Sequence, residues 1–253
     1  MTRPQFEIKN LTMAYGDFVV MRNLDFVIPR GEIFVIMGGS GCGKSTLLKH
    51  MIGLLDPTEG EVCFEGRSFT AADKEARQEM LRQFGITFQA GALWTSMTLA
   101  ENIALPLREY TDLSVDEIKE VASLKLSLVG LRGFEGFFPH EISGGMQKRA
   151  SLARAMALDP KVLFFDEPSA GLDPVSSRRL DDLILQLRDS LGTTIIIVTH
   201  ELQSIFSIAD NSVFLDVELR TQSALGNPSE MLKNPPNANV YQFLTRSSES
   251  VAV

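Results

Sequence analysis

Eight consecutive residues have the types and spacing that bind phosphate. Residues 38–45 fit the pattern G-x-x-x-x-G-K-[ST], between an apolar run at 33–37 and a run of helical character at 46–52. A buried strand leading through such a loop into a helix turns backbone N–H groups and the positive helix end toward an anion. Lys44 is then expected to reach the β- and γ-phosphates, and the Ser45 hydroxyl to bind Mg²⁺. The loop predicts that the protein binds a nucleoside triphosphate.

Two carboxylates at the end of a second apolar run supply what a phosphate loop lacks for hydrolysis. Residues 162–165 are all apolar, and Asp166 and Glu167 follow them. Open α/β sheets place ligands at the carboxyl ends of their strands, so both acids are expected beside the phosphates. Asp166 is placed to hold Mg²⁺ through water, and Glu167 to polarise the attacking water as general base. The alternative is a strand that simply ends in solvated acids.

A third motif, Ser143-Gly144-Gly145, opens a stretch of helical spacing. Serine and glycine at a helix start can leave backbone N–H groups facing an anion, which predicts a second phosphate cradle. Taken alone, the motif is more often an ordinary helix cap. The next turns of this helix carry Lys148, Arg149 and Arg154.

Size and composition limit the classes of protein that remain. The chain has 253 residues, enough for one large domain or one domain with an inserted lobe. Its net charge of −8 argues against a general nucleic-acid surface, which needs clustered Lys and Arg. The first residues show no secretory signal, and no apolar run approaches the ~18 residues that span a bilayer. A role at a membrane is therefore expected to come through a partner.

The two cysteines, Cys42 and Cys63, have no spacing that suggests a metal site or a redox pair. A disulfide at Cys42 would distort the phosphate loop, so reduced thiols in the cytoplasm are expected. Cys42 is either a reactive thiol, with a pKa lowered by the helix start, or a small loop residue.

Periodicity and turn residues predict an α/β core built from both ends of the chain, with a helical lobe inserted at about 92–158. Strands are predicted at 6–13, 19–21, 24–28, 33–37, 61–64, 86–88, 162–166, 194–199 and 213–215. Helices are predicted at 98–107, 114–129, 143–158, 174–191 and 201–208. Ser114, with Glu117 three residues later, has the pattern of a capping box. Residues 247–253 are expected to be frayed.

The order of these motifs resembles the nucleotide-binding subunit of ABC transporters over nearly the whole chain. Ile142-Ser143-Gly144-Gly145-Met146 resembles the family signature Leu-Ser-Gly-Gly-Gln, with Ile142 and Met146 as departures. The resemblance implies an α/β P-loop NTPase with a RecA-like core, an antiparallel β subdomain and an inserted helical subdomain. It implies one ABC ATPase domain over 1–236, followed by a partly disordered docking tail at 237–253.

The resemblance also implies roles for single residues. Glu167, Gln89 and His200 are implied to be catalytic, with His200 at the γ-phosphate. Mg²⁺ is implied to bind Ser45, Gln89 and Asp166. The residues implied to bind ATP are Tyr15 on the adenine, the loop residues Gly38, Gly39, Ser40, Gly41, Cys42, Gly43, Lys44, Ser45 and Thr46, and, across a dimer interface, Ser143, Gly144, Gly145 and Asp173. His50 and His140 match nothing catalytic and are expected to be structural.

The implied assembly is a head-to-tail dimer that clamps each ATP between the phosphate loop of one copy and residues 143–145 of the other. The two cradles lie on different lobes, and a two-fold axis can bring them together twice. ATP then holds the copies together, and hydrolysis removes the γ-phosphate that held them.

Further segments resemble the ATPases of Mla/MCE transporters, which move phospholipids between bacterial membranes. These segments are residues 89–97, 100–102, 106–114, the Met146 form of the signature, and 240–244. The resemblance implies a multi-spanning permease, an MCE substrate-binding protein and, in some systems, a STAS-domain subunit. It places the chain peripherally on the inner face of the cytoplasmic membrane, through the permease. From the net charge, no nucleic-acid partner is expected.

Two apolar segments have both a docking and a packing interpretation. Residues 89–98, with Trp94 and Met97, could form a groove for a short helix of the permease or pack in the lobe's own core. Residues 237–244 could dock on a second chain or pack on their own domain.

Other functions fit the same ATP motifs. An importer of amino acids or another small solute is one alternative, and an ABC subunit that signals across the membrane without moving cargo is another. A DNA-maintenance or translation ATPase would need a long coiled coil, a second cassette or a basic surface, and none is present in this sequence.

Overall fold

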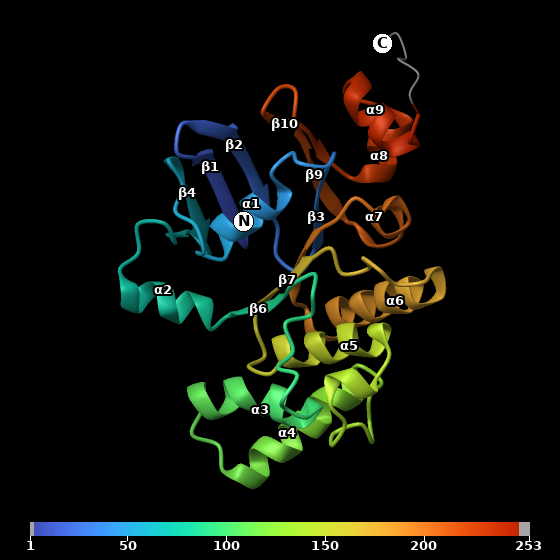
Figure 1. Cartoon of the computed structure of the whole chain (residues 1–253). Helices are drawn as coiled ribbons and strands as arrows, with labels where there is room; N and C mark the ends of the chain where they lie inside the picture. The colour runs from blue at the N-terminus through green and yellow to red at the C-terminus, as the bar shows by residue number, and fades with distance from the viewer. Residues whose placement is uncertain (1–2, 248–253) are drawn as a thin grey trace.

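The computed structural model describes residues 3–247, which form two β-sheets and a separate group of helices (Figure 1). The larger sheet has six strands in the order β10-β9-β3-β8-β7-β6. Its strands are β3 (Ile33–Gly38), β6 (Phe84–Thr87), β7 (Val162–Asp166), β8 (Thr194–Val198), β9 (Asn211–Asp216) and β10 (Thr221–Gly226). The neighbouring pairs from β9 to β6 are parallel, and only β10 runs antiparallel to its neighbour. Parallel strands place their carboxyl ends at one edge, where the predicted site residues follow β3, β7 and β8.

Both faces of this sheet are buried, which explains its nearly continuous apolar strands. Ile33, Val35 and Met37 of β3 face the helical side, while Phe34 and Ile36 face the opposite layer, and all five are fully buried. Because successive side chains of β3 point to opposite faces of the sheet, this one strand contributes to two hydrophobic cores.

The opposite layer is a four-stranded antiparallel sheet in the order β2-β1-β4-β5, together with the helix after the phosphate loop. Its strands are β1 (Phe6–Tyr15), β2 (Phe18–Ile28), β4 (Glu59–Phe64) and β5 (Arg67–Ser68). Phe6 packs against Phe64, Phe84 and Phe164 at 5.2–5.7 Å between ring centroids, which joins the two sheets.

The prediction of two short strands at 19–21 and 24–28 was wrong, because β2 is one continuous strand. The pairing of β1 and β2 shifts register three times between Ile8 and Ala14, and Asn23 has a left-handed φ of 52°. Such irregularities let a strand continue through polar residues that look like a turn in the sequence.

The helical lobe lies at one end of the molecule in Figure 1 and consists of α3 (Leu99–Tyr110), α4 (Val115–Leu128) and α5 (Gly144–Ala155). Ser114 caps α4, and Glu117 completes the box through the Ser114 backbone N–H, so the predicted capping box is confirmed. Thr98 and Glu101 form the same arrangement on α3. α5 ends three residues before the predicted position, and a 3₁₀ turn, η1 (Pro139–Glu141), precedes it.

The remaining helices are α1 (Lys44–Met51), α2 (Lys74–Leu81), α6 (Pro174–Leu191), α7 (Leu202–Ile208), α8 (Pro228–Lys233) and α9 (Ala238–Thr245). α2, α8, β5 and β10 were not predicted from the sequence. Because α2 buries only Met80, its sequence lacks the periodic apolar residues that indicate a helix.

α9 packs on its own domain: Val240 and Leu244 are buried, and the Phe243 ring centroid lies 5.3 Å from that of Phe214. Within residues 3–247, no helix has the length and apolar character to cross a bilayer.

Candidate nucleotide site

The phosphate loop joins β3 to α1 through four glycines, and at Gly38 and Gly43 a side chain would have no room. At Gly38 (φ 149°), an added Cβ would lie 2.5 Å from the Leu215 carbonyl oxygen and 2.7 Å from the Cys42 sulfur. Gly43, with φ 91°, caps α1 in the left-handed region. α1 begins at Lys44, two residues before the predicted start, so the N–H groups of its first turn belong to the loop itself.

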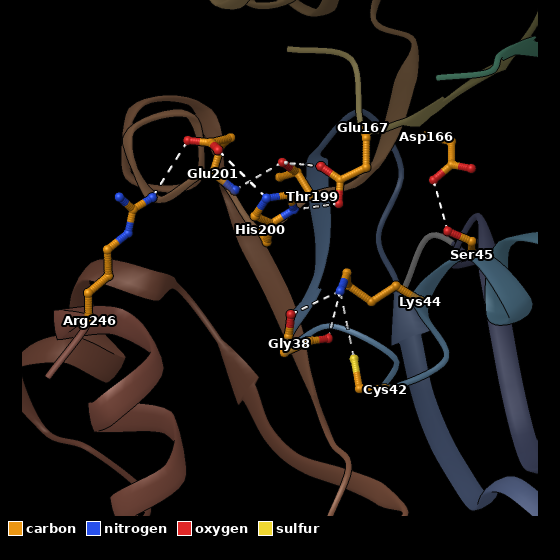
Figure 2. Close-up of polar contacts among 11 residues, drawn as sticks. Gly38, Cys42, Lys44, Ser45, Asp166, Glu167, Thr199, His200, Glu201 and Arg246 are labelled. Carbon is orange, nitrogen blue, oxygen red and sulfur yellow. Dashed lines mark hydrogen bonds and ion pairs between the residues drawn. The ribbon is translucent and has the colours of Figure 1, made fainter. Parts of the chain in front are cut away.

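The Lys44 side chain is held inside this loop. Its Nζ donates to the carbonyl oxygens of Gly38 at 3.0 Å and Gly39 at 2.9 Å, and the residue is only 8% exposed (Figure 2). These carbonyl partners compensate for burying the ammonium group, and Lys44 also lines the open cleft beside the loop. The geometry suits a cation that contacts phosphate oxygens.

Ser45 and Asp166 meet although 121 positions separate them in the chain. The Ser45 hydroxyl donates to Asp166 Oδ1 at 3.1 Å. Burial raises the pKa of the Asp166 carboxyl, while the hydrogen bond from Ser45 opposes that rise. Among residues 3–247 no three His, Cys, Asp or Glu side chains cluster as a metal site. A cation here would need hydroxyl, amide, phosphate and water oxygens beside this carboxylate, a set that fits Mg²⁺ and its retained waters.

Glu167 is fixed by two neighbours that follow β8. Its Oε1 accepts a hydrogen bond from His200 Nδ1 at 2.8 Å, and its Oε2 accepts one from the Thr199 hydroxyl at 3.2 Å (Figure 2). The Glu167 backbone has a left-handed φ of 47° and donates its N–H to the Val198 carbonyl oxygen. Strained conformations of this kind persist where surrounding contacts impose them. Glu167 and His200 are thus held as a pair at the sheet edge.

The phosphate loop, Glu167 and His200 surround one open cleft of about 950 Å³, and Asp166 is not among the residues that line it. The predicted residues that line it are Tyr15, Gly38, Gly39, Ser40, Gly41, Gly43, Lys44, Ser45, Thr46, Gln89, Glu167 and His200. Tyr15 is 50% exposed at the end of β1, which leaves its ring free to stack on a planar base. Cys42 does not line the cleft, because its side chain points into the core.

Sequence reasoning missed several residues that line the same cleft. They are Phe18, Val20, Ala170, Glu201, Leu202, Phe243 and Arg246. Arg246, which follows α9, makes an ion pair with Glu201 at 3.6 Å, beside His200 (Figure 2). A signal for α9 existed in its helical spacing, but which surface it would pack against depends on the tertiary fold.

The second predicted cradle lies away from the cleft of its own chain. Ser143 caps α5 by accepting the Met146 N–H at 3.3 Å, and Asp173 caps α6 by accepting the N–H groups of Val175 and Ser176 at 3.0 Å. An added Cβ at Gly145 would lie 3.5 Å from Ser176, so the two helix starts are adjacent. They form a separate surface with N–H groups and positive helix ends.

The cysteines and two of the histidines have structural surroundings. Burial raises the pKa of both thiols, Cys42 and Cys63, which favours the unreactive protonated form and the interpretation of Cys42 as a small loop residue. His50 is buried with Nδ1 3.0 Å from the Leu55 carbonyl oxygen, and burial lowers its pKa. The His140 ring stacks on Phe138 at 5.7 Å.

Known proteins are similar to this chain in sequence and in fold. The profile of the ABC transporter family matches residues 21–170, and the chain belongs to that family. The intermembrane phospholipid transport system ATP-binding protein MlaF of Haemophilus influenzae is 40% identical over 250 residues, covering 98% of this chain and 93% of that protein. A probable ribonucleotide transport ATP-binding protein, mkl of Mycobacterium leprae, is 42% identical over 238 residues, covering 94% of this chain and 68% of that one.

Among solved structures, a dimeric post-hydrolysis state of the ATP-binding cassette MJ0796, bound to ADP and Pi, superposes with a TM-score of 0.79. It is 29% identical and covers 88% of this chain and 98% of that one. The chain is therefore the ATP-binding subunit of an ABC transporter, with an ATPase domain of the P-loop NTPase fold. The predictions of family, fold class and ATP hydrolysis are confirmed.

Proposed function

We propose that this ATPase powers phospholipid transport between bacterial membranes, through a membrane permease and an MCE substrate-binding protein. The observation that carries the proposal is the 40% identity to an MlaF protein along 98% of the chain. The similar identity to mkl, a probable ribonucleotide transport ATP-binding protein, makes a nucleotide cargo the second candidate.

In the proposed cycle, Glu167 takes a proton from the attacking water, and His200 moves from its bond with Glu167 to contact the γ-phosphate. The 2.8 Å contact between Glu167 Oε1 and His200 Nδ1 supports this exchange, because both groups line the same cleft. Ser45, Asp166 and Gln89 would hold Mg²⁺, which would offset the negative charge of the phosphates. Tyr15 stacks on the adenine.

The proposed dimer places Ser143, Gly144, Gly145 and Asp173 of one copy against the ATP bound in the cleft of the other. Two features support it: these residues lie outside the cleft of their own chain, and they gather at two adjacent helix starts. The dimeric structure of MJ0796 supports the association of two copies. Two-fold symmetry then closes two ATP sites at once.

A groove of about 800 Å³ supports a permease contact. It is lined by residues of α2, β6, α3 and α5, among them Leu81, Phe84, Phe88, Leu105, Pro106 and Tyr110. Phe88, Gly91 and Ala92 contribute to it, whereas Trp94 and Met97 are not among its lining residues, and their predicted docking role stays a prediction. The side chain of Asn102, which belongs to α3, accepts a hydrogen bond from the Trp94 backbone N–H. The Trp94 indole lies outside the groove and is 54% exposed. An amphipathic helix of the permease would suit this groove.

Through the permease the chain would sit peripherally on the inner face of the cytoplasmic membrane. A STAS-domain subunit and docking by the tail at 237–253 belong to the same proposal. The apolar side chains of α9 already pack on the domain, so docking by that tail would use its remaining surface or residues outside 3–247.

The test is purification of the tagged chain from detergent-solubilised native membranes, with mass spectrometry of the proteins and lipids that copurify. A permease with an MCE protein and phospholipid supports the proposal. The purified complex is then reconstituted in vesicles and assayed for ATP-dependent lipid transfer, with labelled ribonucleotides and amino acids as competing cargo. A different permease with a solute-binding protein, or a complex that moves no cargo, contradicts it.

A further inference from the structure

Three side chains on one face of α5 donate to the backbone of the loop that carries Gln89. Lys148 Nζ donates to the Gln89 carbonyl oxygen, Ser151 Oγ to that of Gly91 at 2.5 Å, and Arg154 to that of Ala92. Positions 148, 151 and 154 are three residues apart and share a helix face. Three carbonyl groups within four residues are therefore held by one rigid element.

The loop needs this support, because its backbone is in an unfavourable conformation. Gly91 has a φ of 77°, and Ala92, which is not glycine, has a left-handed φ of 50°. Non-glycine residues hold this conformation only where their surroundings impose it. Ser151 is 4% exposed, so its bond to Gly91 is protected from competition by water.

The far end of the loop is anchored to α3 by one buried side chain. Asn102 is fully buried; its Oδ1 accepts the Trp94 N–H at 2.7 Å, and its Nδ2 donates to the carbonyl oxygens of Trp94 at 3.1 Å and Met97 at 3.2 Å. Both ends of residues 89–97 are thus hydrogen bonded to helices of the helical lobe, although the segment directly follows strand β6 of the larger sheet.

Gln89 itself depends on its backbone for its position. The hydrogen bonds among residues 3–247 include none from the Gln89 side chain, which is exposed and lines the ATP cleft. Lys148, which holds its carbonyl, reaches toward the same edge: burial lowers the Lys148 pKa, and the nearby carboxylates of Asp166 and Glu167 oppose that change. By holding the Gln89 carbonyl oxygen, Lys148 thus limits the positions that the Gln89 side-chain amide can occupy.

We propose that Lys148, Ser151 and Arg154 are positioning residues for Gln89. By hydrogen bonding to the 89–92 backbone, they set the affinity of the ATP site for its divalent cation. The inference rests on the proposed role of Gln89 as a cation ligand. It extends that role to a helix whose first residue, Gly144, belongs to the cradle for the partner's ATP. A change in the tilt of α5 would thereby move Gln89 and change the cation affinity of the ATP site in the same chain.

The test compares Lys148→Met, which keeps the aliphatic stem but loses the donor, with Lys148→Arg, which restores a donor. Arg149→Met is the matched control, because Arg149 lies on the same helix and donates to backbone carbonyls of Val129 at 2.9 Å and Gly130 at 3.3 Å, away from the loop. Should Lys148→Met fail to fold, Ser151→Ala replaces it.

Two readouts besides turnover are used on the full chain. Hydrogen–deuterium exchange of the peptide over 88–97 reports the anchoring, together with fluorescence of Trp94, the single tryptophan. Titration of Mn²⁺ and Mg²⁺ with a non-hydrolysable ATP analogue reports cation affinity. In Lys148→Met we expect faster exchange and a cation affinity about five-fold weaker, the size of the effect of losing one hydrogen bond. Lys148→Arg recovers both values, and Arg149→Met changes neither.

The outcomes separate this inference from the function on which it rests. Unchanged exchange in Lys148→Met overturns the anchoring, and faster exchange with unchanged cation affinity overturns the link to the cation. Gln89→Ala is measured alongside: if its cation affinity equals that of the wild type, the ligand role of Gln89 fails, and the link to the cation fails with it.

Discussion

Replacing Asp181 by Asn should make the protein more stable at neutral pH. Asp181 lies on α6, is 4% exposed and accepts a hydrogen bond from the Ser204 hydroxyl of α7 at 2.9 Å. Burial raises the pKa of its carboxyl to about 6, against the opposing hydrogen bond from Ser204. The folded protein therefore carries a buried charge at neutral pH for which its surroundings compensate incompletely.

The sign and size of the effect follow from the two pKa values. Between pH 3.8 and about 6 the folded state binds more protons at this group than the unfolded state, so the free energy of unfolding falls as pH rises. Above pH 6 the full cost is about 3 kcal/mol, from a shift of about 2 units at 1.36 kcal/mol each. The Asn oxygen can still accept from Ser204, while its new N–H groups cost about 1 kcal/mol if one stays unpaired. The expected net gain at pH 7 is about 2 kcal/mol.

The assay is urea unfolding followed by circular dichroism at intervals from pH 4 to pH 8, with the difference between variant and wild type plotted against pH. The difference should be near zero or slightly negative at pH 4 and should rise to its plateau above pH 6. Asp182→Asn is the control, because Asp182 is exposed in an i,i+4 ion pair with Arg178 at 3.2 Å and should change stability by less than about 1 kcal/mol. An Asp181→Asn protein no more stable than the wild type at pH 7, or a difference independent of pH, would refute the reasoning.

Three further predictions concern the ATP site and the packing beneath it. Glu167→Gln should bind ATP but release phosphate about 10²- to 10⁴-fold more slowly, and light scattering with ATP should detect a dimer; a monomer under these conditions counts against the proposed clamp. Lys44→Ala should lose ATP affinity in a calorimetric titration, and unchanged binding would mean that the loop is misinterpreted. Gly85→Ala should cost about 2 to 3 kcal/mol of unfolding free energy, because its Cβ would meet the Ala155 carbonyl and lie 2.6 Å from Leu163 Cδ2. Gly136→Ala, with nothing within 4 Å, is its control and should be nearly neutral in the same denaturation assay.

The sequence by itself determined the features whose physics is local. The phosphate loop needs only a strand, glycines that tolerate positive φ and a helix start, and these lie within one contiguous stretch from Ile33 to Met51. The capping box of Ser114 and Glu117 spans four residues. The acids after β7 could be placed beside Ser45 because parallel strands share one carboxyl edge, and the hydrogen bond between Ser45 and Asp166 shows the result.

The tertiary structure alone decided which distant elements meet. The approach of Arg246 to Glu201, the grip of Lys148 on the Gln89 carbonyl and the adjacency of the helix starts at Ser143 and Asp173 have no periodic or local signature. They depend on how whole elements pack, and a lysine that will hold a backbone carbonyl looks in the sequence like one that faces solvent. Packing is a sum of many contacts over surfaces far apart in the chain, so its outcome appears only when the elements are in place.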